Sequence, residues 1–179
     1  MTTSNKSERI TMTMLQTRYA PKIGGGPLSS SPIIMAKFVN KKPLCDEDAA
    51  LVEMLNSEGY ESVSYCISDP DLTDLPIIFA SDAFLASTGY GRDEVVGRNC
   101  RFLQGADTSR EDLNRIREAI KKLDELSVVL LNYKKDGSSF INEFFMTPMF
   151  DKYKTLAYFI GVQCSLPPST MKEGHFDHW

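Results

Sequence analysis

The nine residues from Gly97 to Gly105 read GRNCRFLQG and place one thiol, Cys100, between an amide and a guanidinium. A buried structural cysteine normally lies among aliphatic side chains, and a disulfide cysteine needs a partner at a suitable separation. Cys100 fits neither description easily, because Asn99 and Arg101 flank it and an apolar pair follows. The remaining sequence has to explain why a thiol stands there.

The length and composition indicate one ordinary domain with extensions. The chain has 179 residues, of which 42% are hydrophobic, and no run of 18 apolar residues that would predict a membrane span. Its cysteines form no C-x-x-C pair and follow no secretory signal, which favours free thiols in a reducing intracellular compartment, the cytoplasm. Their spacing does not indicate a zinc site, so no metal is expected. The four are Cys45, Cys66, Cys100 and Cys164.

Charge is distributed unevenly between the N-terminal segment and the rest. Residues 1–43 carry seven Lys or Arg and one acid, whereas residues 44–179 carry 13 basic and 23 acidic residues. An acidic body argues against nucleic-acid binding. The basic, Ser/Thr-rich segment indicates a solvated tail, and an organelle transit peptide has the same composition, so targeting stays open.

Hydrophobic periodicity predicts an α+β domain with a five-stranded antiparallel sheet and short helices on one face. The expected organisation is a flexible basic extension over 1–43, a cap helix within 44–60, a core over 61–165 and a tail over 166–179. A longer helix is expected over 108–123. The strands are expected over 62–68, 77–81, 126–135, 138–150 and 155–164.

The longer helix carries two further signals. Thr108 and Glu111 predict a capping box at its start. Arg117 falls on the apolar stripe formed by Leu113, Ile116, Ile120 and Leu123. A guanidinium on that stripe has to be neutralised by a partner or has to reach out of the core, and the pattern does not choose between the two.

Three strands each carry one carboxamide in an otherwise apolar row. Period-two alternation puts Asn132, Asn142 and Gln163 on the same faces as aliphatic and aromatic side chains. A single buried amide usually finds a backbone partner, but three on neighbouring strands favour a planar polar ligand with donors and acceptors. With Arg101 and Arg117 available for a phosphate, a flavin nucleotide satisfies the pattern.

The GRNCRFLQG stretch resembles the signature of LOV (light-oxygen-voltage) domains, the blue-light-sensing branch of the PAS fold. The stretches ISDPDLTDLPIIFASDAFLASTGY (67–90), INEFFMTPM (141–149) and YFIGVQ (158–163) follow the family pattern in the same order. The resemblance covers about residues 61–165. It implies a PAS/LOV fold and a bound flavin mononucleotide (FMN); flavin adenine dinucleotide is less favoured because the insertion after the Gln104 position is absent.

The resemblance also implies site residues. Asn132 and Asn142 would bind the pyrimidine edge of the flavin, Asn99 and Gln104 the ribityl chain, and Arg101 and Arg117 the phosphate. Ser68 would lie near the ring edge. The residues expected to pack on the ring are Leu103, Ile120, Leu130, Phe144 and Phe159.

The family's chemistry gives Cys100 a role. Its sulfur would bond to the flavin C4a atom after blue-light absorption and leave again in darkness. We expect a neutral thiol beforehand, since apolar surroundings raise a thiol's pKa. Gln163 would answer protonation of the flavin by rotating its carboxamide. Cys66 and Met146 depart from the family pattern and either tune the adduct lifetime or simply fill the core.

The leading interpretation is a short LOV photoreceptor, not an enzyme. It would signal through Gln163 and the sheet to the N-terminal cap, a light-dependent homodimer or another protein, with no nucleic-acid or membrane partner. An apolar outer sheet face supports such contacts. The alternative is a PAS-type flavin- or ligand-binding redox sensor in which light is incidental. A flavoenzyme is disfavoured, because neither a catalytic acid–base pair nor a nicotinamide fingerprint is visible.

Overall fold

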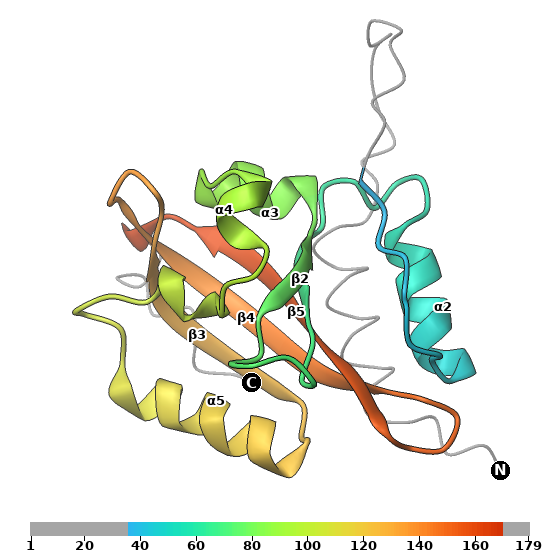
Figure 1. Cartoon of the computed structure of the whole chain (residues 1–179). Coiled ribbons are helices and arrows are strands. Elements are labelled where there is room, and N and C mark those ends of the chain that lie inside the picture. Colours follow the sequence, from blue (N-terminus) through green and yellow to red (C-terminus); the bar gives the residue numbers. More distant parts are fainter. Residues whose placement is uncertain (1–35, 170–179) are drawn as a thin grey trace, which may run out of the picture.

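A five-stranded antiparallel sheet forms the centre of the computed structural model, which describes residues 36–169 (Figure 1). The strand order is β2-β1-β5-β4-β3. The sequence predicted all five strands, with ends that differ by one to two residues. Their bounds are β1 (Ser64–Ser68), β2 (Ile77–Ala80), β3 (Leu126–Tyr133), β4 (Ser139–Phe150) and β5 (Leu156–Leu166).

Short helices follow β2 and lead to β3. They are α3 (Asp82–Thr88), α4 (Arg92–Val95), the 3₁₀ helix η1 (Cys100–Leu103) and α5 (Arg110–Lys122). The helix α2 (Asp46–Leu55) precedes the sheet and buries Val52 and Leu55 in one cluster with Tyr158 and Ile160 of β5. Successive residues of a strand point to opposite faces, so α2 covers the face opposite to that of Phe159. No helix within residues 36–169 is both long and apolar enough to cross a membrane.

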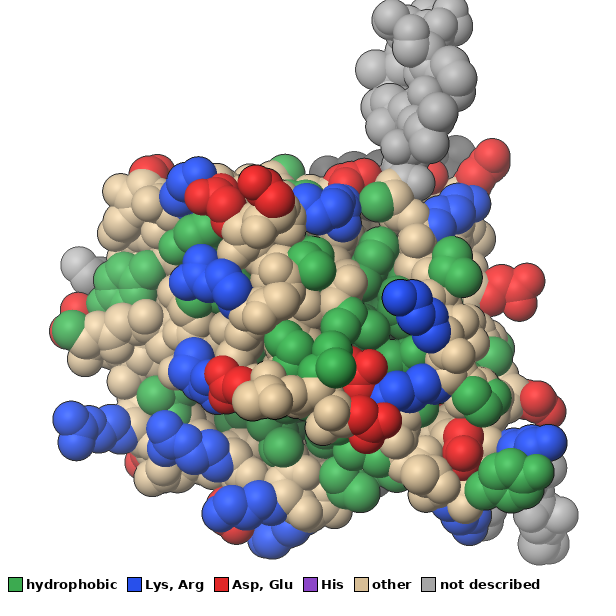
Figure 2. Space-filling view, in the orientation of Figure 1, with side chains coloured by type: hydrophobic (Ala, Val, Ile, Leu, Met, Phe, Trp, Pro, Cys, Tyr) green, Lys and Arg blue, Asp and Glu red, His purple; other side chains and the backbone are tan. Residues whose placement is uncertain are grey.

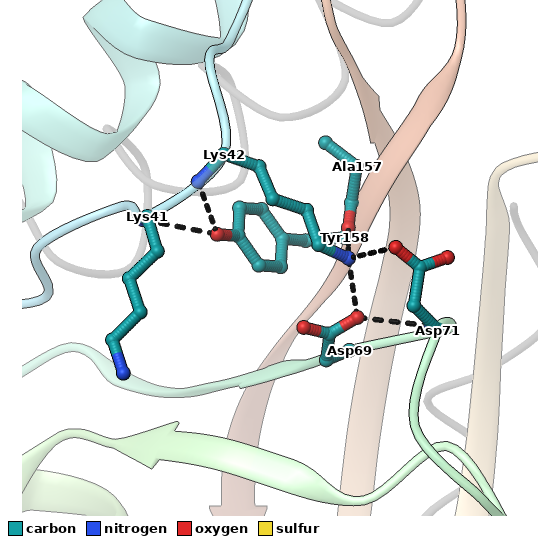
Figure 3. A network of polar contacts seen from close by, with 6 residues as sticks. All are labelled: Lys41, Lys42, Asp69, Asp71, Ala157 and Tyr158. Carbon is teal, nitrogen blue, oxygen red and sulfur yellow. Dashed lines mark hydrogen bonds and ion pairs between the residues drawn. The ribbon is translucent and has the colours of Figure 1, made fainter.

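The extended segment before α2 is fastened to the outer face of β5. Phe38 is buried, and its ring lies 5.6 Å from that of Phe79 and 5.5 Å from that of Tyr158. The Tyr158 hydroxyl accepts hydrogen bonds from the backbone N–H groups of Lys41 (3.1 Å) and Lys42 (2.9 Å), as Figure 3 shows. Residues 36–43, which we assigned to the flexible extension, therefore pack on the domain; residues 1–35 lie outside the described part.

Lys42 adds an ionic contact to the same attachment (Figure 3). Its Nζ atom donates to the carbonyl oxygen of Ala157 at 3.0 Å and lies 2.8 Å from a carboxylate oxygen of Asp71. It also pairs with Asp69, which precedes Asp71 in the connection between β1 and β2. One lysine thus joins the N-terminal segment to β5 and to that connection.

The predicted capping box at the start of α5 is wrong. The helix begins at Arg110 and is capped by Ser109, whose side chain accepts from the backbone N–H of Asp112 at 3.3 Å. Thr108 instead donates to the carbonyl oxygen of Leu131 (2.7 Å) and accepts from the N–H of Gly105 (2.9 Å). Its hydroxyl is buried against β3 and satisfies backbone groups there, so it is not available to cap the helix.

The predicted place of Arg117 on the buried stripe of α5 is also wrong. The side chain is exposed, and its Nη1 atom donates to Asn114 Oδ1 at 2.7 Å. Ala119 is buried, whereas Leu113, Ile116 and Ile120 of the predicted stripe are half-buried. Ala119 was not part of the predicted stripe, and its burial turns the helix so that Arg117 faces away from the sheet.

Candidate functional site

A cavity lies between the inner face of the sheet and the helices η1 and α5. It encloses about 670 Å³ of space free of protein atoms, part of it open to solvent. Eleven of the fourteen predicted site residues line it, and three (Asn99, Arg101 and Arg117) do not. The predicted residues that line it are Ser68, Cys100, Leu103, Gln104, Ile120, Leu130, Asn132, Asn142, Phe144, Phe159 and Gln163.

The three predicted carboxamides meet on the cavity wall. Asn132, Asn142 and Gln163 come from β3, β4 and β5 and are each no more than 3% exposed. The Nδ2 atom of Asn142 donates to Asn132 Oδ1 at 3.0 Å and to Gln163 Oε1 at 3.2 Å. Strand alternation and the antiparallel order of β3, β4 and β5 bring the three amides together, as the sequence predicted.

One buried atom of this group has no hydrogen-bond partner among the described residues. It is Asn142 Oδ1, the oxygen of the central carboxamide. A buried acceptor without a donor costs about 1–3 kcal/mol, so the arrangement fits a ligand that presents an N–H group to this wall. The imide edge of a flavin has such a group, and the apolar side chains of Leu103, Leu130 and Phe144 suit its flat ring.

Ser64 belongs to the same hydrogen-bonded group, although we did not predict it. It pairs with Gln163 across the β1–β5 ladder, and Gln163 Nε2 donates to its hydroxyl at 3.0 Å. The signal was present in the alternation of β1, where Ser64, Cys66 and Ser68 share one face. A serine on the same strand face as cavity residues is a candidate partner for an amide.

Cys100 opens η1 and is partly buried at the cavity. Burial raises the pKa of its thiol, an effect that the neighbouring Arg101 guanidinium opposes. Burial also raises the pKa of the fully enclosed Cys66 thiol, which lines the same cavity. Both sulfurs are therefore protonated at neutral pH, and the neutral thiol expected for Cys100 has a physical basis.

Glycine at position 161 leaves room for an aromatic ring on the cavity wall. A Cβ atom at this position would lie 2.7 Å from Phe144 Cε2 and 3.6 Å from Cys66 Sγ. The ring of Phe144 therefore lies directly over the β5 backbone. This contact fixes one of the flat surfaces that line the cavity.

Asn99, expected on the ribityl chain, and Arg101, expected on the phosphate, lie beside the connection between β1 and β2. Asn99 Nδ2 donates to the carbonyl oxygen of Asp74 at 2.6 Å, and Asn99 Oδ1 accepts from the N–H of Arg101 at 3.1 Å. Arg101 pairs with the Asp74 carboxylate at 2.5 Å. Leu75, next in the chain, lines the cavity, so this group lies at its edge.

Arg117 lies on the exposed face of α5. In the view of Figure 2, basic side chains gather over α5 at the lower left, while apolar side chains are exposed at the centre, next to charged ones. Arg101 is also more than half exposed. Neither guanidinium is buried, so both can move toward an anion without disturbing the packing of the core.

Comparison with known proteins identifies the fold. The family described as "PAS domain" matches residues 62–163. A LOV domain solved for a study of a flavin analogue and the domain's mechanism superposes with a TM-score of 0.64 and 40% identity, covering 69% of this chain and 89% of that chain. The chain belongs to the PAS family, and its core is a LOV domain.

Other LOV proteins resemble the chain over the same region. The light-state LOV domain of Aureochrome1 has a TM-score of 0.59 and 42% identity, covering 61% of this chain and 85% of that one. Phototropin-2 of Oryza sativa subsp. japonica is 52% identical over 100 residues, and the blue-light photoreceptor of Listeria monocytogenes is 44% identical over 110. These matches cover 56% and 62% of this chain but only 11% and 43% of the relatives, so the shared part is the LOV domain.

Proposed function

We propose that the chain is a blue-light photoreceptor that holds FMN in this cavity and signals through a reversible bond to Cys100. The observation that carries the proposal is a protonated, partly buried thiol on the same cavity as three buried carboxamides. The similar proteins support it, because they include a phototropin and a blue-light photoreceptor.

Different cavity residues would bind different parts of the cofactor. Asn132 and Asn142 hold the pyrimidine edge, and Asn142 Oδ1 gains the donor that it lacks among the described residues. Gln104 lines the cavity on the side of the ribityl chain, and Ser68 lies at the ring edge. The apolar residues that pack on the ring are Leu103, Ile120, Leu130, Phe144 and Phe159.

The mononucleotide is favoured over the dinucleotide because the insertion after the Gln104 position is absent. Asn99 and Gln104 would hold the ribityl chain, and Arg101 and Arg117 would receive the phosphate. Both guanidinium groups are exposed and form planar forks that match phosphate oxygens. FMN ends at that phosphate, so its polar end lies at the protein surface.

The flavin supplies blue-light absorption and an electrophilic carbon, C4a, that a sulfur atom can attack. Cys100 would provide the sulfur, and burial keeps the thiol protonated, so that its proton can pass to flavin N5 as the sulfur bonds to C4a. In darkness the bond would break and the N5 proton would return to the Cys100 sulfur, so no substrate would be converted.

Gln163 is the first residue to respond. Its amide nitrogen carries two hydrogens, one of which goes to Ser64. Toward the cavity, the amide can offer an N–H to an acceptor or, after rotation, its oxygen to a donor. Tyr158 lies on the same strand with its side chain on the opposite face, and its hydroxyl holds the N-terminal segment. A displacement of β5 therefore reaches residues 36–43.

We propose two outputs for this displacement, release of the N-terminal segment and a light-dependent homodimer. The segment covers buried side chains of the outer face, including Phe79 and Tyr158, which its release would expose. Newly exposed apolar surface favours association with a second copy or with another protein. Scattering mass measured in darkness and under blue light distinguishes a dimer from a monomer.

The deciding experiment uses the purified full chain. The protein is expected to be yellow, to bleach under blue light and to recover in darkness, whereas Cys100→Ala stays yellow without bleaching. Chromatography of the extracted flavin distinguishes FMN from flavin adenine dinucleotide. A Cys100→Ala protein that bleaches normally would falsify the adduct. A yellow wild type that responds to reductants but never to light would favour the redox-sensing alternative.

A further inference from the structure

We infer that Ser87 is a positioning residue: through Ser64, its hydroxyl fixes the direction in which the Gln163 carboxamide faces. The inference rests on the proposed function, because it names the groups that hold the responding residue in its dark orientation. Neither serine lines the cavity. Ser64 lies on β1 and Ser87 on α3.

A continuous row of hydrogen bonds connects the cavity wall with α3. Asn142 donates to Gln163 Oε1 at 3.2 Å, and Gln163 Nε2 donates to Ser64 Oγ at 3.0 Å. The Ser64 and Ser87 hydroxyl oxygens are 3.4 Å apart. Ser87 in turn donates to the carbonyl oxygen of Phe84 at 3.0 Å. Ser64 is 6% exposed, and Ser87 is half-buried at the outer end of the row.

The last bond sets the direction of the row. A serine hydroxyl carries one hydrogen, and Ser87 gives it to the Phe84 carbonyl. Ser87 can therefore only accept from Ser64. Since the hydrogen of Ser64 goes to Ser87, Ser64 presents a lone pair to Gln163, and the NH2 group of Gln163 faces it.

The opposite orientation of Gln163 conflicts with this arrangement. Rotation by half a turn would bring Oε1 opposite the Ser64 oxygen, where two acceptors would meet. Ser64 could bond to the rotated amide only by donating its hydrogen to Gln163 Oε1 in place of Ser87. The bond from Ser64 to Ser87 therefore stabilises one orientation of the carboxamide and is lost in the other.

Removal of the Ser87 hydroxyl takes this preference away. In Ser87→Ala, Ser64 loses its acceptor in the dark orientation but can still donate to a rotated Gln163. The rotated orientation of the Gln163 amide is then stabilised relative to the dark orientation, so recovery of the dark state slows. The expected size is about two- to tenfold, the effect of one neutral hydrogen bond.

The chain offers a matched control and a rescue variant. Ser57 also donates to the carbonyl oxygen three residues earlier, that of Met54, at 2.6 Å, but it is exposed and remote from the cavity. Ser57→Ala removes the same type of bond outside the row. Ser87→Thr keeps a hydroxyl at the position, so it should retain the wild-type behaviour.

The test compares these variants by dark recovery after blue light and by the side-chain amide resonance of Gln163 in protein kept in the dark. That resonance is assigned by its absence in Gln163→Leu. Ser87→Ala should slow recovery about two- to tenfold and shift the resonance, whereas Ser57→Ala and Ser87→Thr should do neither. An unshifted resonance with wild-type recovery in Ser87→Ala would overturn the inference, as would equal slowing in Ser57→Ala. A wild-type protein that never bleaches would overturn the proposed function instead. In that case the Gln163 amide resonance of protein kept in the dark would test this inference by itself.

Discussion

Asp74 and Arg101 form an ion pair at the edge of the cavity, with 2.5 Å between the carboxylate oxygen and the guanidinium nitrogen. The guanidinium lowers the pKa of the Asp74 carboxyl, which is therefore ionised at neutral pH. A bound phosphate would approach an arginine that already has an anionic partner. Under the proposed function, the carboxylate would compete with the phosphate for the same guanidinium.

Asp74→Asn should tighten the binding of FMN and leave the binding of riboflavin unchanged. The expected gain is about two- to fivefold, since both partners are more than half exposed and such pairs contribute little. Titration of the flavin-free protein with each compound measures the difference. Riboflavin, which lacks the phosphate, is the internal control. Equal changes for the two flavins would mean that Asp74 does not act on the phosphate.

The Cys100 thiol should keep its proton above its ordinary pKa of about 8.5, because burial raises that pKa. The S–H stretching band that Cys100→Ala removes reports the proton. Since the folded protein holds a proton that the unfolded chain releases, the free energy of unfolding should fall as pH rises above about 8.5.

Variants of the neighbouring charges should move this titration in opposite directions. Arg101→Ala removes a positive charge that lowers the Cys100 pKa, so its midpoint should move to higher pH. Asp74→Asn removes a negative charge that raises the same pKa, so its midpoint should move to lower pH. A wild-type midpoint at or below about pH 8.5 contradicts the burial effect.

Tyr158→Phe should loosen the N-terminal segment. The lost hydroxyl accepts from the N–H groups of Lys41 and Lys42, and its removal should lower the free energy of unfolding by about 1–3 kcal/mol. Amide hydrogen exchange should become faster at those two residues. The exposed Tyr153 provides the control, since Tyr153→Phe should change neither quantity. Unchanged exchange in Tyr158→Phe would show that the hydroxyl does not hold the segment.

Gly161→Ala should weaken flavin uptake by displacing the Phe144 ring, which a Cβ atom would approach to 2.7 Å. Phe144→Ala removes the ring, so Gly161→Ala should reduce flavin affinity much less in that background. Flavin affinity measured in the wild type, both single variants and the double variant gives the coupling. Additive losses of flavin affinity would mean that Gly161→Ala does not act through the Phe144 ring.

The sheet and the cavity wall could be predicted because both depend on local alternation. Asn132, Asn142 and Gln163 stand in apolar rows, and the period of two along each strand fixes the face on which each one lies. Resemblance to a family then gave Cys100 its proposed role. These predictions needed the order of strands, but no knowledge of how the helices are oriented.

The predictions that failed concern contacts between elements. Thr108 matched a capping pattern, yet its hydroxyl bonds to Leu131 on β3, and no helical pattern contains that strand. Arg117 was predicted on the buried face of α5, but Ala119 packs there and Arg117 is exposed. Asp74 and Ser87 acquire partners 27 and 23 residues away, Arg101 and Ser64, so local sequence gave no signal for them. Side chains that bond across loops follow from tertiary packing alone.

The partnerless oxygen of Asn142 has a consequence for the making of the protein. If the proposed flavin supplies the donor that Asn142 Oδ1 lacks among the described residues, binding of the pigment stabilises the folded core. Freshly synthesised chains in a vitamin-poor cell would open more often and be degraded sooner. The amount of sensor would then follow the supply of riboflavin, before any light falls on it.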